Sequence, residues 1–258
     1  MRSRLNLRQR ILYDLGEKIV LGHYLPGNVL PRENDLADHY DVSRTVIREA
    51  VKGLAARGLL SSRRNVGATV NPRSEWQWID GDVIAWALSN KQNRADVLLY
   101  LYEAFAVINP AVIENVALNA TPEEHKQVWA AFRQLEASQQ GDIEDWDRAI
   151  GEWYIVLHRI CRSPILQSIA MRVNEIFRSN LHDLTATRLA LSSPHVNLPW
   201  THSSAEALQH HRQICQCIEL QDSDMAFIIA RRLFRAVLYN VRILCSDPQV
   251  RKLIETAL

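Results

Sequence analysis

The sequence predicts a mainly α-helical protein with an amino-terminal winged helix-turn-helix and a carboxy-terminal all-helical bundle. Two observations lead to this prediction. Residues 1–73 contain three short amphipathic segments followed by a basic strand pair, and nearly every segment after residue 80 has helical periodicity. We therefore divide the 258 residues into a winged domain at 1–73, a linker and junction helix at 74–93, and a helical domain at 94–258.

Charge is distributed unevenly between these parts. Residues 1–73 contain 13 Lys and Arg against 7 Asp and Glu, whereas residues 74–258 contain 17 against 22. A basic first part beside an acidic second part indicates a polyanionic partner for the first part only. Chance variation in surface charge is the alternative, and the motifs decide between the two.

The composition indicates a cytoplasmic protein with no membrane partner. No unbroken apolar segment follows the basic start of the chain, so a signal peptide is not expected. The most apolar run, Val97–Leu118, is interrupted by charged and amide side chains and by Pro110, which argues against a membrane span. The four cysteines have neither zinc-ribbon spacing nor the density of a disulfide scaffold, and we expect reduced core thiols.

Three helices are expected in the winged domain. The first, Arg4–Leu21, carries apolar residues at helical spacing and ends at a turn-rich segment. The second begins near Glu33, and its inward-facing residues are Leu36, Ala37 and Tyr40. The third follows Ser43, whose hydroxyl is expected to cap the first turn by accepting a backbone N–H.

The third helix has two distinct faces. One arc is apolar and is expected to pack on the domain: Ile47, Ala50, Val51 and Leu54. The other arc presents three cations and a hydroxyl: Arg44, Thr45, Arg48 and Lys52. Arginine reads guanine edges bidentately in the major groove, while lysine and threonine hold phosphates, so this arc predicts a DNA recognition helix. A solvated basic helix face is the alternative for this helix taken alone.

A basic hairpin follows the third helix. Leu59–Arg64 is expected to form a strand, and Ala68–Val70 its partner across a turn at Asn65–Gly67. A basic hairpin directly after a helix-turn-helix is typical of a wing, which lays Arg63 and Arg64 along a groove of DNA. The context therefore favours DNA recognition over a solvated face.

The motifs of this domain are Gly27–Glu33, Leu36–Ala37, Val42–Ala50, Gly58–Leu60 and Gly67–Val70. They resemble the signature of the GntR family of transcription regulators. The resemblance implies that Arg44 and Arg48 contact operator bases, that Ser43 contacts the DNA backbone, and that the wing tip enters the minor groove. The DNA-binding residues so predicted are Arg32, Asn34, Ser43, Arg44, Thr45, Arg48, Lys52, Arg63, Arg64, Asn65 and Gly67.

Two positions depart from the family pattern. Asn34 stands where the family frequently has an arginine that contacts DNA, and Asn65 replaces the usual wing-tip glycine. Asparagine tolerates positive φ better than other non-glycine residues, so we expect the turn to be kept while the bases read differ.

The linker contains three tryptophans, Trp76, Trp78 and Trp86. Aromatic residues at a domain junction typically join the two domains, and a ligand-stacking box is the alternative. We expect the first role.

The remaining residues are expected to form a bundle of helices. Their predicted spans are 80–90, 94–119, 122–140, 143–161, 164–190, 203–220 and 222–246. Thr121-Pro122-Glu123-Glu124 is a strong helix start, because a capping hydroxyl, an early proline and early carboxylates all favour a helix amino-terminus. The apolar segments Val97–Leu118 and Met225–Leu244 are expected at the centre of the bundle.

The motifs of the helical part are Asn109–Ala111, Ser163–Leu166, His211–Arg212, Ile218 and Asp222–Ala226. Together with the tryptophan linker, they resemble the FCD ligand-binding domain of the FadR-type subfamily of GntR regulators, and within it regulators of sugar-acid operons of the galactonate type. The resemblance implies that residues 94–258 bind an effector and pair the subunits.

Most members of that subfamily bind a divalent metal ion through one aspartate and three histidines. The matching positions here are Ile150, Tyr154, His211 and Leu233, of which only His211 is a metal ligand. One imidazole does not complete the four-donor shell of a zinc-type ion, so we expect no metal and no other cofactor. Phe105 stands where the family often has an arginine that grips the effector.

The effector site predicted from these positions consists of Tyr154, His158, Arg178 and His211. Arg178 matches a family arginine that faces the pocket, and a guanidinium is suited to an anionic effector. His158 follows Tyr154 by four residues and shares its helix face. Ordinary core histidines are the alternative for His158 and His211.

The motifs together predict a sequence-specific DNA-binding transcription regulator, a repressor rather than an enzyme. Its expected partners are double-stranded operator DNA, a second copy of the chain in a homodimer, and a small-molecule effector such as a sugar acid or another carboxylate. Neither a glycine-rich phosphate loop nor a nucleophile elbow nor a metalloprotease helix occurs in the sequence. An effector-independent DNA-binding protein with a degenerate pocket is the second hypothesis.

Overall fold

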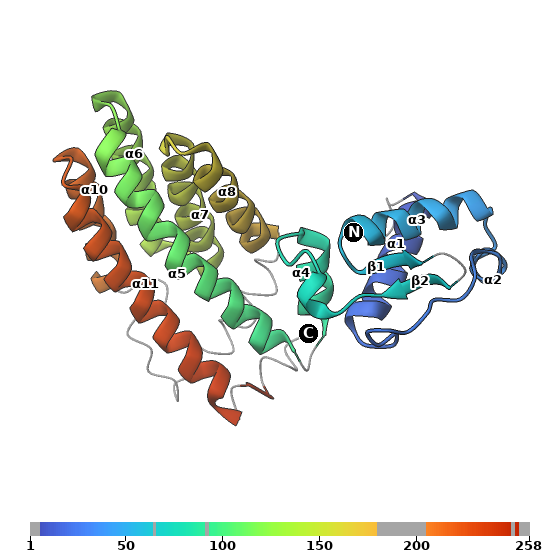
Figure 1. The fold of residues 1–258 in the computed structure, drawn as a ribbon. Helices are drawn as coiled ribbons and strands as arrows, with labels where there is room; N and C mark the ends of the chain where they lie inside the picture. Colours follow the sequence, from blue (N-terminus) through green and yellow to red (C-terminus); the bar gives the residue numbers. More distant parts are fainter. Residues whose placement is uncertain (1–5, 64–65, 91–92, 180–204, 249–250, 253–258) are drawn as a thin grey trace. The chain divides into compact units, whose positions relative to one another are not determined.

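The computed structural model describes residues 6–63, 66–90, 93–179, 205–248 and 251–252 of the chain. Two compact units are found, residues 1–94 and residues 95–258. The described residues are mainly helical, and their one sheet has two strands, as the sequence predicts (Figure 1). Each unit contains its own set of fully buried aliphatic residues.

Three helices form the first part of the amino-terminal unit: α1 (Leu7–Val20), α2 (Glu33–Tyr40) and α3 (Arg44–Ala56). α1 begins with a capping box, in which the Asn6 side chain accepts from the Gln9 backbone and the Gln9 side chain accepts from the Asn6 backbone. α1 packs on α3. The most deeply buried residues of the two helices are Leu15, Ile19, Ile47, Ala50 and Leu54.

The start of α3 differs from the prediction in one respect. Ser43 occupies the N-cap position with extended backbone, but its side chain makes no capping hydrogen bond. Its carbonyl oxygen accepts hydrogen bonds from the amides of Val46 and Ile47, at 3.0 and 3.4 Å. A serine hydroxyl rotates to suit its surroundings, so its place in the chain does not by itself fix its partner. Ser43 is exposed, which leaves its hydroxyl accessible to another molecule.

The wing is an antiparallel pair of strands, β1 (Leu60–Arg63) and β2 (Gly67–Val70), in which Leu60 lies opposite Val70 and Arg63 opposite Gly67. Gly67 has a φ of +106°, a conformation that residues with a side chain rarely adopt, which explains a glycine at the end of the turn. Arg64 and Asn65 of the predicted turn lie outside the described residues, as does the side chain of Arg63.

Two of the linker tryptophans belong to the core of the first unit. The short 3-10 helix η2 (Arg73–Glu75) and the helix α4 (Gly81–Ser89) follow the wing, and α4 packs on α1. Trp76 and Trp86 are only 5% and 3% exposed. The Trp86 ring lies so close to Gly16 of α1 that a Cβ atom there would come within 2.4 Å of it. The structure therefore gives these rings a packing role inside one unit.

Arg57, which follows α3, ties the end of that helix to the start of α4. Its guanidinium contacts the carboxylates of Asp80, with 3.2 Å between Nε and Oδ1, and of Asp82, which also accepts a hydrogen bond from the Tyr13 hydroxyl. Asp80 caps α4 by accepting from the amides of Asp82 and Val83. The ion-paired side chains are 21–25% exposed, so water screens them less than it screens a fully exposed pair.

The carboxy-terminal unit is a bundle of long helices. Those described are α5 (Arg94–Asn119), α6 (Pro122–Ala137), α7 (Ile143–Ile160), α8 (Pro164–Ser179), α10 (Ala205–Glu219) and α11 (Ser223–Ser246), with the 3-10 helix η3 (Ser138–Gln140) after α6. Segment 180–204 lies outside the described residues, and with it the end of the predicted helix 164–190. A capping box between Thr121 and Glu124 opens α6, as the sequence predicts.

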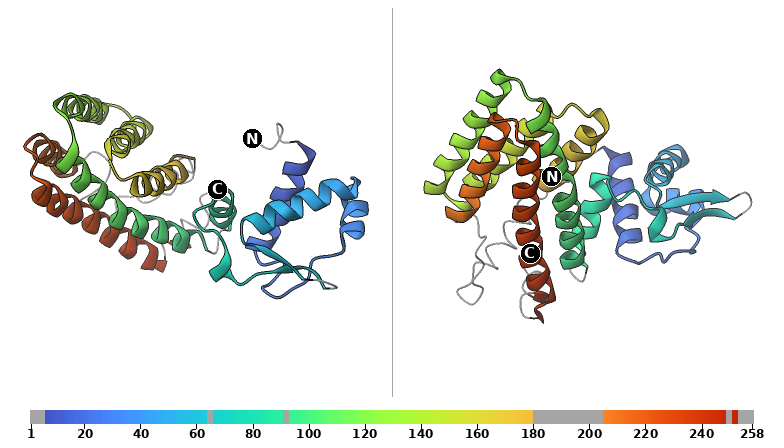
Figure 2. Two further views of the ribbon diagram at one scale, coloured as in Figure 1. Left: turned by 45° about the horizontal axis from the view of Figure 1, so that its top comes forward. Right: turned by 60° about the vertical axis from the view of Figure 1, so that its left-hand side comes forward.

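α5 is the most apolar helix of this bundle, and α11 lies beside it (Figure 2). Its fully buried residues include Val112, Ile113, Val116 and Ala117. By length and composition α5 is able to cross a membrane, as the core helices of globular proteins also are, and nearly half of its most apolar stretch is buried. α11 runs antiparallel to it, because Arg242 pairs with Glu103 at 2.9 Å and Cys245 Sγ lies 3.4 Å from the Ala95 carbonyl. All four cysteines are buried free thiols, as expected.

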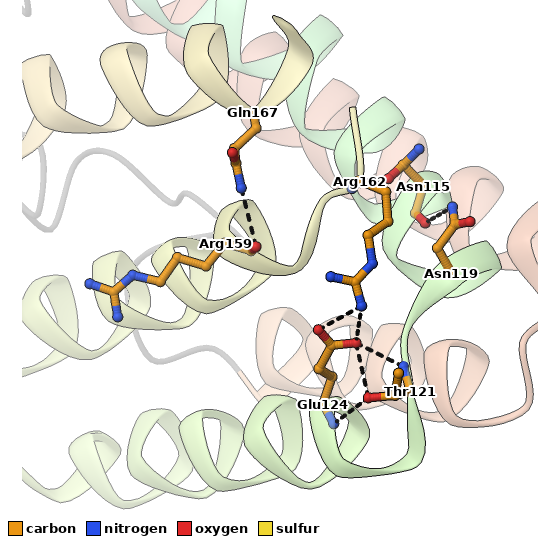
Figure 3. Close-up of polar contacts among 7 residues, drawn as sticks. All are labelled: Asn115, Asn119, Thr121, Glu124, Arg159, Arg162 and Gln167. Carbon is orange, nitrogen blue, oxygen red and sulfur yellow. Dashed lines mark hydrogen bonds and ion pairs between the residues drawn. The ribbon is translucent and has the colours of Figure 1, made fainter. Parts of the chain in front are cut away.

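The turn between α7 and α8 is fixed to the neighbouring turn between α5 and α6 (Figure 3). The Arg162 guanidinium donates to both carboxylate oxygens of Glu124, at 2.6 and 2.8 Å, and the Arg162 amide donates to the Asn115 side chain at 2.7 Å. Gln167 of α8 donates to the carbonyl of Arg159 at 3.1 Å, which holds the first turn of α8 against the end of α7. These contacts set the position at which α8 begins.

Candidate DNA-binding surface and effector cavity

The recognition helix α3 has one exposed polar face and one buried apolar face. Its exposed side chains include Arg44, Thr45, Arg48 and Lys52. Its fully buried side chains are Ile47, Ala50 and Leu54. The helical period of the sequence therefore separates the residues that pack from those that meet solvent.

Glu33, in the first turn of α2, pairs with both Arg44 and Arg48. Its Oε2 atom lies 3.1 Å from Arg44 Nε and 3.2 Å from Arg48 Nη2. Burial raises the pKa of Glu33, but the hydrogen bonds from Arg48 and Arg44 outweigh this effect and hold the pKa below its ordinary value. Glu33 is thus a positioning residue for the two arginines. Sequence reasoning misses it, because an acidic residue early in a helix is explained by the helix dipole alone.

A groove of about 700 Å³ lies between this helix pair and the wing. The predicted DNA-binding residues that line it are Arg32, Asn34, Arg44, Arg48 and Gly67. Ser43, the N-cap of α3, and Thr45 and Lys52 on the helix are exposed but do not line the groove. Lys52 pairs with Glu49 at 2.9 Å on the helix surface, where an ion pair contributes little and yields easily to a phosphate. The groove therefore offers arginine side chains to a polyanionic backbone.

The second unit contains a cavity of about 150 Å³ lined by α5, α7, α8, α10 and α11. Three of the four predicted effector residues line it: Tyr154, Arg178 and His211. Ile150 and Leu233 line it as well, so the four positions matched to the metal ligands of related domains converge on one cavity. Much of the remaining wall is aromatic: Tyr102, Phe105, Trp146, Phe177 and Phe234.

His211 faces the cavity with an unprotonated nitrogen. Its Nδ1 lies 2.7 Å from the carbonyl oxygen of Ala207, which only accepts hydrogen bonds, so Nδ1 carries the proton. Nε2 is then an acceptor, and the Tyr154 hydroxyl lies 3.4 Å from it. Burial lowers the pKa of His211 to about 4 and raises the pKa of Tyr154. Both side chains are therefore neutral at pH 7.

His158 lies away from the cavity, contrary to the expectation from its spacing. It is 1% exposed, and its Nε2 donates to Asn109 Oδ1 of α5 at 3.0 Å. The Asn109 amide nitrogen in turn donates to the Phe105 carbonyl at 3.2 Å, next to Pro110 inside the helix. Burial lowers the pKa of His158 to about 4. A four-residue spacing from Tyr154 places it on the same side of α7 but does not determine which neighbour it meets.

α8 contributes two polar residues to the cavity, Asn174 and Arg178, one helical turn apart. The Arg178 guanidinium is 42% exposed and its Nη1 contacts Glu152 Oε1 of α7 at 2.7 Å. Asn174 is only 4% exposed, and its side chain makes no hydrogen bond to any residue that the structure describes. A buried amide without hydrogen bonds lowers the stability of the fold unless a ligand or a water molecule forms hydrogen bonds with it. No sequence signal points to Asn174, because a single amide in an amphipathic helix is common.

Comparisons with known proteins match both units. Residues 7–70 match the family model of bacterial regulatory proteins, gntR family, and residues 100–236 match the FCD domain model. The chain belongs to the GntR family. It is a DNA-binding transcription regulator with an FCD effector-binding domain and not an enzyme, as the sequence predicts.

Relatives of this GntR regulator span most of its length. The galactonate operon transcriptional repressor of Escherichia coli is 29% identical over 86% of this chain and 91% of its own. An uncharacterized HTH-type transcriptional regulator of Mycobacterium tuberculosis is 30% identical over 71% of this chain and 73% of its own. A solved structure of Lar, described as controlling the Listeria monocytogenes agr system, covers 94% of this chain and 99% of its own with a TM-score of 0.55. At 20% identity, that likeness shows the fold alone.

The divalent metal ion that the resemblance to FCD domains implies does not fit the residues at these positions. Ile150 and Leu233 have no donor atom, and the buried Tyr154 phenol is neutral. Over the described part of the chain, no three His, Cys, Asp or Glu side chains are grouped to hold a metal ion. His211 keeps a hydrogen bond from Nδ1 to a backbone carbonyl, which is typical of a metal-bound histidine. The other three positions matched to metal ligands have no side chain suited to bind the ion.

The two buried histidines predict a loss of stability in mild acid. In the folded protein burial lowers the pKa of His158 and His211 from 6.5 to about 4, so the unfolded chain binds more protons between these values. Their neutral forms therefore stabilise the fold fully above pH 6.5, and this stability is lost as the pH falls toward 4. We expect urea unfolding followed by circular dichroism to give a free energy of unfolding about 1 to 2 kcal/mol lower per histidine at pH 5 than at pH 7.

His158→Gln is the matched variant for this measurement. Glutamine keeps a donor for Asn109 but does not titrate, so about half of the pH dependence should disappear. An unchanged pH dependence in this variant would show that other groups are responsible.

Proposed function

We propose that this regulator is a repressor that acts in the cytoplasm as a homodimer and leaves its operator when a sugar acid or another carboxylate enters the cavity of the second unit. The observation that carries the proposal is the exposed pair Arg44 and Arg48, held by one carboxylate beside the wing groove. Two guanidinium groups fixed side by side on a recognition helix are suited to reading guanine edges. A repressor of the galactonate operon among the relatives supports both the sign of regulation and the class of effector.

Arg178 supplies the cation that a carboxylate effector needs. It is the only Arg or Lys among the described residues that line the cavity. The Arg178 side chain is 42% exposed and that of its partner Glu152 is 46% exposed, so water screens this ion pair and it is weak. A ligand carboxylate competes with Glu152 for the guanidinium by forming two parallel hydrogen bonds.

Subunit pairing is supported by exposed apolar residues on α5 and α11. On α5 they are Tyr100, Val107 and Leu118, and on α11 they are Ile228, Tyr239 and Ile243. α5 also carries the acidic Glu114, and Glu103, which pairs with Arg242 of the same chain, whereas α11 carries the exposed Arg231, Arg232 and Arg235. Two copies related by a two-fold axis bring the acidic helix of each against the basic helix of the other. A dimer also presents two recognition helices to a palindromic operator.

Substitutions on α3 test the DNA readout. Arg44→Ala and Arg48→Ala should each weaken binding to the operator by about 1 to 3 kcal/mol, because each removes base contacts, and should weaken binding to random DNA less. Lys52→Ala should weaken binding to the operator and to random DNA alike. It should also lower the slope of log affinity against log salt concentration by about one, as expected for a phosphate contact. Glu33→Gln should strengthen binding to random DNA and reduce the preference for the operator, because it frees the two arginines.

Fluorescence anisotropy with the operator duplex and a scrambled duplex, at several salt concentrations, measures these effects. Equal losses on the two duplexes for both arginine variants would show that the base contacts lie elsewhere.

Release of DNA tests the effector half of the proposal. Galactonate and other sugar acids, titrated into the complex of the full chain with its operator, should release the DNA. Arg178→Gln should raise the required concentration by about tenfold or more, since it removes a charge-assisted contact. Arg172→Gln is the matched control, because Arg172 lies on the same helix but does not line the cavity. If no carboxylate shifts operator binding by the folded protein, the effector-independent hypothesis holds instead.

Sedimentation tests the dimer. The wild-type chain should sediment as a dimer at micromolar concentration, and Val107→Lys should shift it toward monomer by placing a charge in the apolar contact. Ile165→Lys is the matched control, because Ile165 on α8 is 75% exposed and Val107 is 74% exposed. A monomeric wild type, with and without DNA, would contradict the proposal, as would equal effects of the two substitutions.

A further inference from the structure

Three polar groups of the cavity lack strong partners among the residues that the structure describes: the Tyr154 hydroxyl, His211 Nε2 and the Asn174 amide. They come from α7, α10 and α8 and line the same space of about 150 Å³. The 3.4 Å between the Tyr154 oxygen and His211 Nε2 is long for a hydrogen bond from a hydroxyl, so this contact is weak. A molecule that enters this space therefore meets three polar groups that are free to form stronger hydrogen bonds.

A hydroxyl group is the chemical match for Tyr154 and His211. His211 Nε2 only accepts, since the proton sits on Nδ1 against the Ala207 carbonyl. A ligand hydroxyl is able to donate to Nε2 and to accept from the Tyr154 hydroxyl at the same time. A carboxylate does not match this pair, because an ionised carboxylate has no proton to donate to Nε2.

Asn174 extends this hydrogen-bonding surface toward Arg178. The two residues lie one turn apart on α8, so a ligand whose carboxylate reaches Arg178 carries its neighbouring atoms past Asn174. The amide offers both donors and an acceptor, which suits a hydroxyl group of either orientation. The aromatic walls lower the polarity around the ligand, and direct hydrogen bonds inside them are correspondingly stronger.

We propose that the FCD domain of this protein binds a polyhydroxy carboxylate directly, with hydroxyl groups at Tyr154, His211 and Asn174 and the carboxylate at Arg178, and without a metal ion in the site. This inference rests on the proposed function, because it takes a sugar acid as the effector. Hydrogen bonds then do what chelation does in related domains. Selectivity follows from the hydroxyl groups, since an analogue without them leaves buried polar groups unpaired.

The test is calorimetric titration of the full chain after dialysis against EDTA. The probes are a panel of sugar acids that includes galactonate, and hexanoate, which has the same carbon chain and carboxylate as galactonate but no hydroxyl groups. We expect the best sugar acid to bind equally well before and after EDTA, and hexanoate to bind at least about tenfold more weakly. Metal analysis of protein purified without a histidine tag should find no stoichiometric metal.

Variants assign the hydroxyl contacts. Tyr154→Phe and Asn174→Leu should each weaken binding of the best sugar acid by roughly fivefold to thirtyfold while changing hexanoate binding little. Arg172→Gln should leave both affinities unchanged. Tyr154→Phe removes a single oxygen and keeps the ring contacts. If Asn174→Leu fails to fold, Tyr154→Phe alone still tests whether hydroxyl contacts bind the sugar acid.

Distinct outcomes overturn this inference and the proposed function. Stoichiometric zinc, nickel or manganese, with loss of sugar-acid binding in EDTA and unchanged helical circular dichroism, would show that a metal holds the ligand. Equal binding of hexanoate would refute the hydroxyl contacts, and no binding by the whole panel would refute the ligand class. Sugar-acid binding that depends on Tyr154 and Asn174 but does not release operator DNA would contradict the proposed function and leave this inference standing.

Discussion

The packing of aromatic rings around Phe105 is the constraint on which the effector domain depends. Phe105 of α5 meets Tyr154 of α7, Phe177 of α8 and Phe234 of α11, with ring centroids 6.1, 4.1 and 6.4 Å away. Tilted and edge-to-face contacts of this kind bury large apolar areas and also have preferred geometries, so one side chain fixes four helices at the cavity wall. The resemblance assigns a metal ion and an arginine to this region in related domains. Here Phe105 stands at the position matched to the arginine, and Ile150 and Leu233 stand at two positions matched to metal ligands.

The same packing determines the chemistry of the cavity. Low exposure to water makes a charged imidazole unfavourable, so the pKa of His211 falls to about 4 and the ring offers a lone pair rather than a positive charge. Tyr154 stays protonated for the same reason. The cavity wall also includes one buried carboxylate, Asp147, and its cation, Arg178, lies at the edge, where it contacts Glu152 and solvent. The Arg178 cation at one edge of an aromatic cavity distinguishes the two ends of a ligand.

In the DNA-binding unit, side chains fix both ends of the recognition helix. Glu33 of α2 holds Arg44 and Arg48 near its start, and Arg57 anchors its end to Asp80 and Asp82 at the start of α4. Both arginines are more than half exposed, so their ion pairs with Glu33 are weak and the guanidinium groups stay available to DNA. Because α4 packs within the same compact unit, the junction helix and the recognition helix belong to one body.

Local sequence patterns determined the helices, the wing and the two faces of α3, because periodicity and capping act between residues close in the chain. The capping box at Thr121 and the basic face with Arg44 are examples. Tertiary structure alone decided which polar side chains meet. The contact of Glu33 with the arginines, the burial of His158 against Asn109, and the position of Asn174 in the cavity all depend on how separate helices cross. Helical spacing specifies the side of a helix on which a residue lies, but the neighbour that it faces there is set by packing between distant segments.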